Sequence, residues 1–169
     1  MDLKAHIRGI PDFPIPGILF YDISTILSNP SALEYAVTAM QEKISALQPD
    51  IIAGIESRGF LFATPLAMRM GLPMMMIRKA GKLPGEVVSY EYELEYGTDT
   101  IQIQADAIRA GQKIVIIDDL LATGGTLSAS VRLCQQVGGE VVGCGVVIEL
   151  DFLSGRDALD APCISLVNY

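Results

Sequence analysis

Two adjacent carboxylates and a glycine-threonine loop form the stretch of this sequence with the clearest capacity for chemistry. Asp118 and Asp119 follow an apolar run and come just before the loop. Glycines allow a tight turn that presents several backbone N–H groups to one point, and a helix that starts there adds unpaired N–H groups and partial positive charge. Two threonine hydroxyls add further donors. The loop is therefore predicted to bind one phosphate group, and this phosphate cradle consists of Ala122, Thr123, Gly124, Gly125 and Thr126.

The paired aspartates suit a sugar better than a second phosphate. Ionised carboxylates only accept hydrogen bonds, so they favour the vicinal hydroxyls of a ribose or a magnesium ion. A phosphate cradle beside two carboxylates thus predicts a site for a ribose 5-phosphate. The loop matches neither a Walker A motif nor a G-x-G-x-x-G motif. The alternatives are a strand-end turn with helix caps, or a phospho-receiver domain, whose paired aspartates lie near the N-terminus and not in the last third.

Composition narrows the classes of partner. The chain has 169 residues, of which 50% are hydrophobic, and this length suits one domain, residues 1–169. A formal net charge of -8 argues against nucleic acid or a membrane surface as a partner. His6 is the only histidine, which excludes a histidine-based catalytic triad. The three cysteines lack C-x-x-C spacing and are expected to be reduced thiols, and the absence of an apolar signal core predicts a cytoplasmic protein.

Apolar runs alternate with amphipathic stretches along most of the chain. This alternation predicts an α/β fold with a mainly parallel central sheet flanked by helices. Ligands bind outside the carboxyl ends of the strands in such sheets, where the loops 56–59, 79–100 and 118–126 are expected. Strands are expected over residues 50–55, 73–77, 113–117, 140–148 and 163–167, the last at an edge, and helices over 31–47, 60–70 and 126–137.

Two segments depart from this alternation. Residues 1–30 are rich in proline and short turns, so they are expected to lie over the rest of the domain as a hood and not to form a core. Within residues 79–100, the stretch 87–94 is expected to pair with 100–104 as an extended ribbon. A long connection of this kind in a compact domain is typical of a lid over a site.

Four further stretches extend the pattern over nearly the whole chain. With the string around Asp118, they resemble the adenine phosphoribosyltransferases, a branch of the type I phosphoribosyltransferase family, which binds phosphoribosyl pyrophosphate (PRPP). The resemblance implies that adenine and PRPP give AMP and pyrophosphate in purine salvage, with Mg²⁺ and in a homodimer. The stretches are DFPIPGILFYDIS (12–24), GIESRGFLFATPLA (54–67), IRKAGKLPG (77–85) and YELEYGTD (92–99).

Two other functions stay open. One is the same fold acting on another purine, xanthine or guanine. The other is a non-catalytic PRPP sensor, which would need an attached DNA-binding module, and an acidic chain of 169 residues is expected to leave no room for one. In each case Mg²⁺ is expected to be held mainly by PRPP and water, with Asp118 or Asp119 as a potential ligand.

The residues expected to bind pyrophosphate combine donors and positive charge. The guanidinium of Arg58 is a planar fork of donors that suits pyrophosphate, and the alternative is a surface salt bridge. Lys79 and Lys82 belong to the densest basic cluster, for which the alternative is a solvated charge run. The resemblance adds Tyr96 and implies a peptide bond that is often cis in the loop around Arg58. The whole predicted set is Glu56, Ser57, Arg58, Gly59, Lys79, Lys82 and Tyr96.

Catalytic and base-binding residues rest on the resemblance. Glu95, like the family's carboxylate at this position, is expected to exchange a proton with the purine while the lid excludes water, and Arg58 is expected to assist. A plain exposed glutamate is the alternative for Glu95. Phe20 is expected to stack on the purine, with backbone groups of Leu19 and Tyr21 reading its edge. Many relatives have Arg or Lys where this chain has Tyr21.

Overall fold

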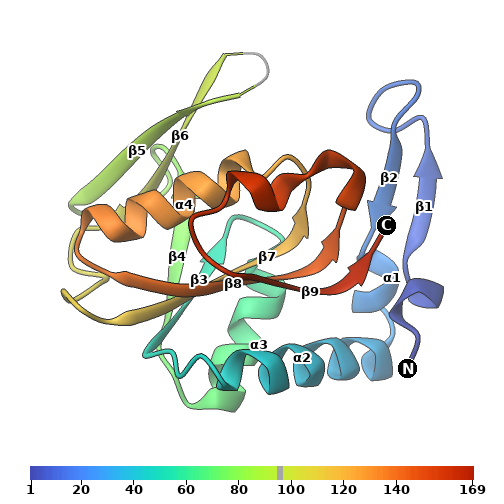
Figure 1. Ribbon diagram of the computed structural model, residues 1–169, viewed down its shortest axis with the longest axis horizontal. Helices are drawn as coiled ribbons and strands as arrows, with labels where there is room; N and C mark the ends of the chain where they lie inside the picture. The colour runs from blue at the N-terminus through green and yellow to red at the C-terminus, as the bar shows by residue number, and fades with distance from the viewer. Residues whose placement is uncertain (95–96) are drawn as a thin grey trace.

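The computed structural model describes residues 1–94 and 97–169. Within these residues the main sheet has seven strands in the order β5-β6-β4-β3-β7-β8-β9 (Figure 1). The pairs β3–β4, β3–β7, β7–β8 and β8–β9 are parallel, whereas β6 runs antiparallel to β4 and β5. This confirms a mainly parallel sheet. The strands are β3 (Ile51–Ile55), β4 (Met74–Lys79), β5 (Val87–Glu93), β6 (Thr98–Gln104), β7 (Lys113–Leu121), β8 (Glu140–Glu149) and β9 (Cys163–Asn168).

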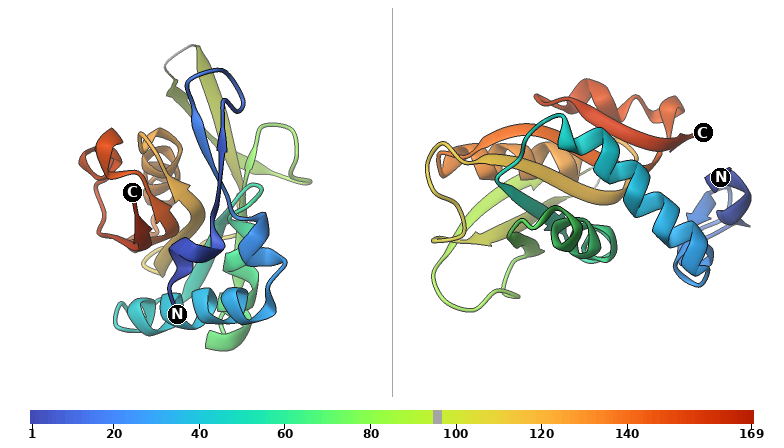
Figure 2. Two further views of the ribbon diagram at one scale, coloured as in Figure 1. Left: turned by 90° about the vertical axis from the view of Figure 1, so that its right-hand side faces the viewer. Right: turned by 90° about the horizontal axis from the view of Figure 1, so that it is seen from below.

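Helices cover both faces of the sheet (Figures 1 and 2). Helices α2 (Pro30–Ser45) and α3 (Phe60–Met70) pack on one face, and α4 (Gly125–Gln136) packs on the other. Because successive side chains of a strand point to opposite faces, β7 supplies both cores: Ile117 lies in the core under α2 and α3, and Ile116 lies in the core under α4. Both side chains are fully buried.

Local capping signals set the helix ends close to their expected places. The side chain of Asn29 accepts hydrogen bonds from the N–H groups of Ser31 (3.1 Å) and Ala32 (3.2 Å), which makes it the N-cap of α2. Helix α3 ends at Gly71, whose φ of 64° lies in the left-handed region that glycine adopts without strain.

The N-terminal segment forms a small hairpin that the sequence did not predict. Strands β1 (Arg8–Pro11) and β2 (Leu19–Asp22) pair antiparallel as a separate two-stranded sheet, which we call the N-terminal hairpin. The prolines of this segment hide the alternation by which a strand is recognised. A 3-10 helix (Leu3–His6) precedes the hairpin and α1 (Ser24–Leu27) follows it. Buried side chains of the segment, Leu3, Ile23 and Ile26, join the core under α2 and α3.

The expected pairing of residues 87–94 with 100–104 is confirmed. Strands β5 and β6 form a hairpin, which we call the ribbon, with a register from Val87↔Gln104 to Glu93↔Thr98. The ribbon joins the main sheet where Lys79 of β4 pairs with Ile101 of β6. The left view of Figure 2 shows that the ribbon and the N-terminal hairpin project from the same side of the molecule.

The expected end of the third strand at residue 117 is wrong. Strand β7 continues to Leu121, with Asp118 opposite Val146 and Leu121 opposite Glu149 of β8. The strand extends because β8 is itself long enough to supply hydrogen-bonding partners beyond the aspartates. Asp118 and Asp119 therefore lie within a strand, so their directions are fixed by the sheet, and the connection to α4 begins only after Leu121.

The three cysteines match the expectation of reduced thiols. Cys134, Cys144 and Cys163 are free thiols. Burial raises the pKa of Cys134 to about 12, so this thiol is unreactive at neutral pH. Among the described residues, every helix is too short or too polar to cross a bilayer.

The N-terminal hairpin is tied to α1 through Asp22, and this contact predicts an acid-sensitive contribution to stability. Asp22 accepts hydrogen bonds from Ser24 N (2.9 Å) and Arg8 Nε (3.1 Å). Hydrogen bonding with the side chain and backbone of Ser24, followed by that with Arg8, lowers the pKa of Asp22 from 3.8 to about 2. A lowered carboxyl pKa stabilises the fold above the unfolded-state pKa, and the gain is lost as pH falls through the folded-state value. We expect the unfolding free energy of Asp22→Asn to fall less between pH 3.8 and about 2 than that of the unsubstituted protein.

Urea unfolding at stepped pH measures this slope. Asp106→Asn removes an exposed carboxylate and serves as the matched control, which should retain the original slope. Equal slopes for Asp22→Asn and the unsubstituted protein would contradict the assignment.

Candidate functional site

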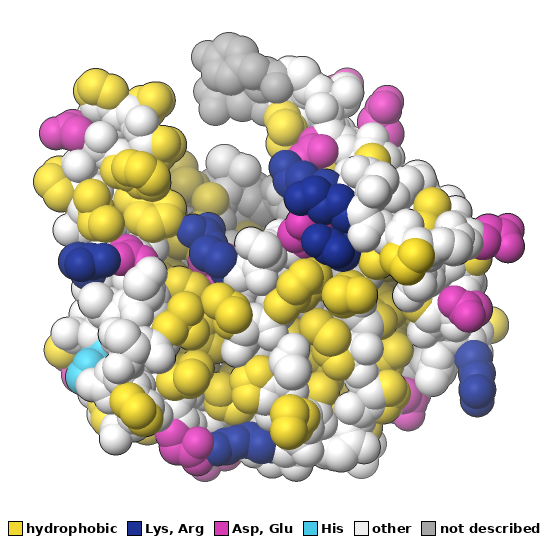
Figure 3. All heavy atoms as spheres, turned by 180° about the vertical axis from the view of Figure 1, so that it is seen from behind, with side chains coloured by type: hydrophobic (Ala, Val, Ile, Leu, Met, Phe, Trp, Pro, Cys, Tyr) yellow, Lys and Arg dark blue, Asp and Glu magenta, His cyan; other side chains and the backbone are white. Residues whose placement is uncertain are grey.

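A cavity of about 520 Å³ opens at the carboxyl ends of β3 and β7. The strand order reverses here, because the chain continues from β3 to β4 on one side and later returns as β7 on the other. Figure 3 shows a hollow between the N-terminal hairpin, which carries hydrophobic side chains, and the ribbon, with Lys and Arg side chains gathered beside it. The lining comes from the loop after β3, the end of β4, the ribbon and the segment from β7 into α4. All three expected loops thus contribute to one cavity.

The phosphate cradle lies between the end of β7 and the start of α4, and all five of its predicted residues line the cavity. Gly124 adopts a φ of 86°, a conformation that favours glycine, and α4 begins at Gly125. The first turn of a helix leaves N–H groups without intrahelical acceptors, and the helix dipole adds positive potential there. The cradle therefore offers backbone donors, hydroxyls and positive potential to an anion.

A second loop, which sequence reasoning missed, supports the cradle from behind. We call residues 151–158 the buttress loop. A Cβ on Gly155 would come closer than 3.0 Å to the carbonyl oxygen of Ala122, and a Cβ on Gly124 would come as close to the carbonyl oxygen of Gly155. Arg156 anchors this loop through two hydrogen bonds to the buried Glu149, of 2.5 Å and 2.6 Å. Gly155 belongs to no recognisable motif, so only its packing reveals it.

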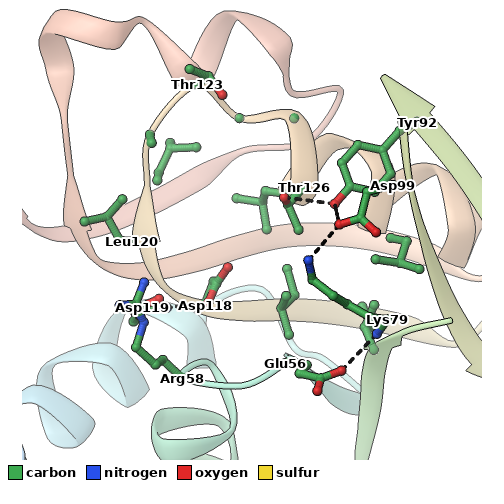
Figure 4. A pocket seen from close by; sticks show the side chains of 18 of the residues that line it. Glu56, Arg58, Lys79, Tyr92, Asp99, Asp118, Asp119, Leu120, Thr123 and Thr126 are labelled. Carbon is green, nitrogen blue, oxygen red and sulfur yellow. Dashed lines mark hydrogen bonds and ion pairs between the residues drawn. The ribbon is translucent and has the colours of Figure 1, made fainter. Parts of the chain in front are cut away.

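The two aspartates of β7 face different surroundings (Figure 4). Asp118 is partly exposed to the cavity, and its Oδ1 accepts the N–H of Asp119 at 2.8 Å. Asp119 is only 4% exposed, and its Oδ2 lies 2.8 Å from Arg58 Nε in an ion pair. The angle at this contact is not that of a hydrogen bond, so among the described residues Oδ2 has no hydrogen-bond donor. The ion pair holds Asp119, whereas Asp118 is open to a ligand.

Burial shapes the charge of this pair. Burial, followed by the neighbouring Asp119 carboxylate, raises the pKa of Asp118 well above its ordinary value. Burial also raises the pKa of Asp119, although the Arg58 guanidinium opposes the rise. Hydroxyl groups or a cation brought to these oxygens would relieve the cost of keeping two carboxylates close together.

The loop after β3 carries Arg58 across to β7. The Glu56–Ser57 peptide bond is cis, as the resemblance implied for this loop. A Cβ on Gly59 would lie closer than 3.0 Å to the carbonyl oxygens of Ile55 and Ile117, so the loop passes directly against the middle of β7. Glu56, Ser57 and Arg58 line the cavity, while Gly59 shapes the loop without lining it.

The basic cluster is held in place by carboxylates. Glu56 accepts hydrogen bonds from Lys82 Nζ (2.8 Å), the N–H of Lys79 (2.9 Å) and Arg78 Nη2 (3.2 Å). Burial alone would raise the pKa of Glu56, but these hydrogen bonds lower it to about 2. Lys79 and Arg78 line the cavity, whereas Lys82 does not. The predicted cluster therefore exists, and Glu56 serves as its anchor.

The predicted base-binding residues lie beside the cavity and do not line it. The Arg58 guanidinium carbon is 5.4 Å from the centre of the Phe20 ring, and the ring of Phe13 packs edge-on against Phe20 at 5.1 Å. The side chain of Tyr21 packs on the C-terminal Tyr169, with ring centres 4.1 Å apart, and Leu19 is 49% exposed. Arg58 thus connects the Phe20 ring with Asp119.

Two predicted residues, Glu95 and Tyr96, lie outside the described part of the chain. Two others that line the cavity, Tyr92 and Asp99, escaped the sequence reasoning. They stand opposite each other across the ribbon. Tyr92 Oη lies 3.2 Å from Thr126 Oγ1 and 3.5 Å from Asp99 Oδ2, while Lys79 Nζ donates to the same oxygen at 2.8 Å (Figure 4). The predicted ribbon placed Asp99 in its turn, before residue 100, so only the observed register reveals this pair.

Comparisons with known proteins agree with this geometry. The family described as "Phosphoribosyl transferase domain" matches residues 22–168. An adenine phosphoribosyltransferase of Gluconacetobacter diazotrophicus is 59% identical, over 100% of this chain and 96% of the relative. The crystal structure of an adenine phosphoribosyltransferase from Thermoanaerobacter pseudethanolicus superposes with a TM-score of 0.96 at 48% identity, covering 99% of this chain and 98% of the other. The structure of the Saccharomyces cerevisiae adenine phosphoribosyltransferase, complexed with the bisphosphate D-DIAB and adenine, superposes with a TM-score of 0.92 at 42% identity. The match covers 98% of this chain and 96% of the other.

The contact between the buttress loop and the cradle predicts a steric effect on phosphate binding. In Gly155→Ala the added methyl group would collide with the Ala122 carbonyl and displace the cradle. We expect affinity for ribose 5-phosphate to fall by on the order of tenfold, because small misplacements of donors are costly. Calorimetric titration measures the affinity, and Ser154→Ala, an exposed neighbour, is the control. A folded Gly155→Ala protein with undiminished affinity would show that the contact does not set the cradle.

Proposed function

Because the chain belongs to the phosphoribosyl transferase family, we propose that it transfers the 5-phosphoribosyl group of PRPP to adenine, giving AMP and pyrophosphate in purine salvage. One observation carries the proposal: a single cavity unites the phosphate cradle, the two aspartates and the basic cluster. These three features match the three parts of PRPP that carry charge or hydroxyl groups. The names of the relatives, all adenine phosphoribosyltransferases, support adenine as the acceptor.

The phosphate cradle and the aspartates hold the part of the substrate that does not react. Backbone N–H groups and hydroxyls from residues 122–126 donate to the 5-phosphate, while Asp118 accepts hydrogen bonds from the ribose hydroxyls. Asp119 is held by Arg58 at 2.8 Å and so supports the sugar from a fixed position. With both ends of the ribose fixed, its anomeric carbon is oriented toward the incoming base.

The basic side chains stabilise the departing pyrophosphate. As the bond from the anomeric carbon to the pyrophosphate oxygen breaks, negative charge accumulates on the leaving group and positive charge on the sugar ring. Arg58, Lys79 and Lys82, with the N–H groups of the loop through Gly59, supply donors and positive charge on the leaving-group side. A ring nitrogen of adenine then forms the new bond to the anomeric carbon.

The N-terminal hairpin supplies the surface for the base. Phe20 offers an aromatic face beside Arg58, and Phe13 fixes the orientation of its ring. Backbone groups of Leu19 and Tyr21 are proposed to read the edge of the purine. Because the Tyr21 side chain packs on Tyr169, it is the backbone at this position and not the phenol that is available for the base.

The ribbon is proposed to close over the reacting groups. Tyr92 and Leu94 of the ribbon already line the cavity. Exclusion of water matters because water would otherwise hydrolyse PRPP. The residues that follow include Glu95, proposed to exchange a proton with the purine, and Tyr96, proposed to contact pyrophosphate; both proposals rest on the family resemblance.

The donors at the site fit Mg²⁺ as a companion of the substrate. Among residues 1–94 and 97–169 there is no cluster of three or more His, Cys, Asp or Glu side chains that could hold a metal ion alone. Mg²⁺ keeps several waters and binds through one or two carboxylates together with substrate phosphates. Asp118 or Asp119 would supply the carboxylate, and the ion would neutralise charge on the pyrophosphate. The partly exposed carboxylate of Asp118 suits this role better than that of Asp119, whose Oδ2 is already ion-paired with Arg58.

The assembly and location follow from the family resemblance and the surface. We propose a homodimer, supported by the exposed hydrophobic side chains of Leu61 and Met68 on α3 and Met76 on β4. We also propose a cytoplasmic enzyme, in keeping with its free thiols.

Incubation with PRPP, Mg²⁺ and each purine in turn tests the proposal. We expect AMP and pyrophosphate from adenine, with turnover of xanthine, guanine and hypoxanthine lower by at least about a hundredfold, because unpaired polar groups in a base site are costly. Nucleotide and pyrophosphate are quantified in the same sample. Turnover of another purine without adenine would favour a different acceptor, and PRPP binding without turnover of any base would favour a sensor.

A further inference from the structure

A carboxylate lines the part of the cavity that is expected to receive a polyanion. Asp99 lies on β6 at the cavity wall, and its Oδ2 accepts a hydrogen bond from Lys79 Nζ at 2.8 Å. The side chain of Lys79 is 59% exposed and that of Asp99 is 22% exposed, so the pair is open to solvent and to ligands. A negative group beside pyrophosphate repels it and weakens its binding. The position of Asp99 at the cavity wall therefore requires an explanation.

Asp99 has hydrogen-bond donors other than Lys79, which would stabilise its ionised form if Lys79 moved away. Its Oδ1 accepts the N–H of Thr100 at 2.8 Å, and Tyr92 Oη lies 3.5 Å from Oδ2. Hydrogen bonding to Lys79, with support from Thr100, lowers the pKa of Asp99. Loss of the lysine would leave these two donors in place, so the carboxylate would not be left unpaired.

The main chain of Lys79 is fixed while its side chain can exchange partners. Its N–H donates to Glu56 Oε2 at 2.9 Å, and β4 pairs with β6 at this residue. The four-carbon stem of lysine carries a compact charge with three rotatable donors. The ammonium group can therefore move between Asp99 and an anion in the cavity without any displacement of the strand.

We propose that Asp99 competes with pyrophosphate for Lys79, so that it weakens pyrophosphate binding and promotes release of this product. This inference rests on the proposed function, which supplies pyrophosphate as the leaving group. Lys79 then has one partner, Asp99, when the pyrophosphate position is empty and another when it is filled. Asp99 is a positioning residue in this account, because it acts on the product through Lys79.

The test is calorimetric titration with magnesium pyrophosphate. Asp99→Asn removes the charge while retaining the shape, and we expect pyrophosphate to bind about two- to fivefold more tightly, the range that corresponds to an exposed ion pair. Glu91→Gln removes the same charge from an exposed position on the same ribbon and should leave the affinity unchanged. In a Lys79→Met background, Asp99→Asn should no longer increase the affinity.

Each other result overturns the inference. Weaker binding by Asp99→Asn would mean that Asp99 orients Lys79 for the ligand and does not compete for it, and unchanged binding would mean that the two are not coupled. If Asp99→Asn still increased the affinity without Lys79, or if Glu91→Gln increased it equally, the effect would come from the overall negative charge of the ribbon and not from competition for Lys79. Absence of pyrophosphate binding in the unsubstituted protein would also refute it. Turnover of purines by the unsubstituted protein judges the proposed function separately.

Discussion

The close passage of the loop after β3 across the middle of β7 is the contact on which the site depends. Gly59 lies at the crossing, where a Cβ would come closer than 3.0 Å to the carbonyl oxygens of Ile55 and Ile117. Without a side chain there, Arg58 reaches 2.8 Å from Asp119 and 5.4 Å from the centre of the Phe20 ring. Asp119 of β7 and the Phe20 ring of the N-terminal hairpin therefore both lie beside one guanidinium.

The acidic character of the chain is compatible with a polyanionic substrate because charge is organised locally. With a net charge of -8, the protein offers no general attraction to phosphates. At the cavity, however, basic side chains are held by carboxylates: Arg58 by Asp119, Lys79 by Asp99, and Lys82 by Glu56. The pairs of Arg58 and Lys82 fix these cations and limit the cost of ordering their long side chains when an anion arrives, whereas the pair of Lys79 with Asp99 must be broken before Lys79 binds an anion.

The sequence predicted those parts of the fold and site whose signals are local. The apolar runs predicted the bounds of β3, β4 and β8 to within one or two residues, because burial leaves a local pattern of apolar residues. The end of α3 was predictable from Gly71, because glycine adopts a left-handed φ without strain. The phosphate cradle was predictable for the same reason, since its donors are consecutive in the chain. The carboxylates of β7 were expected to bind a ligand, which stays a prediction, and their place within the strand was missed because it depends on the length of β8.

Contacts between distant segments could not be predicted in this way. Gly155 supports the cradle from 30 residues further along the chain, and nothing in its neighbours marks that contact. Asp99 meets Lys79 only because β6 pairs with β4. The N-terminal hairpin was missed because its prolines break the alternating pattern of its strands.

A crystal structure of the protein with AMP tests the central claim most directly. The account predicts that the 5-phosphate lies in the turn formed by residues 122–126, with the ribose hydroxyls within hydrogen-bonding distance of the aspartates of β7 and the adenine against Phe20. A nucleotide bound elsewhere, with residues 122–126 free of phosphate, would contradict it.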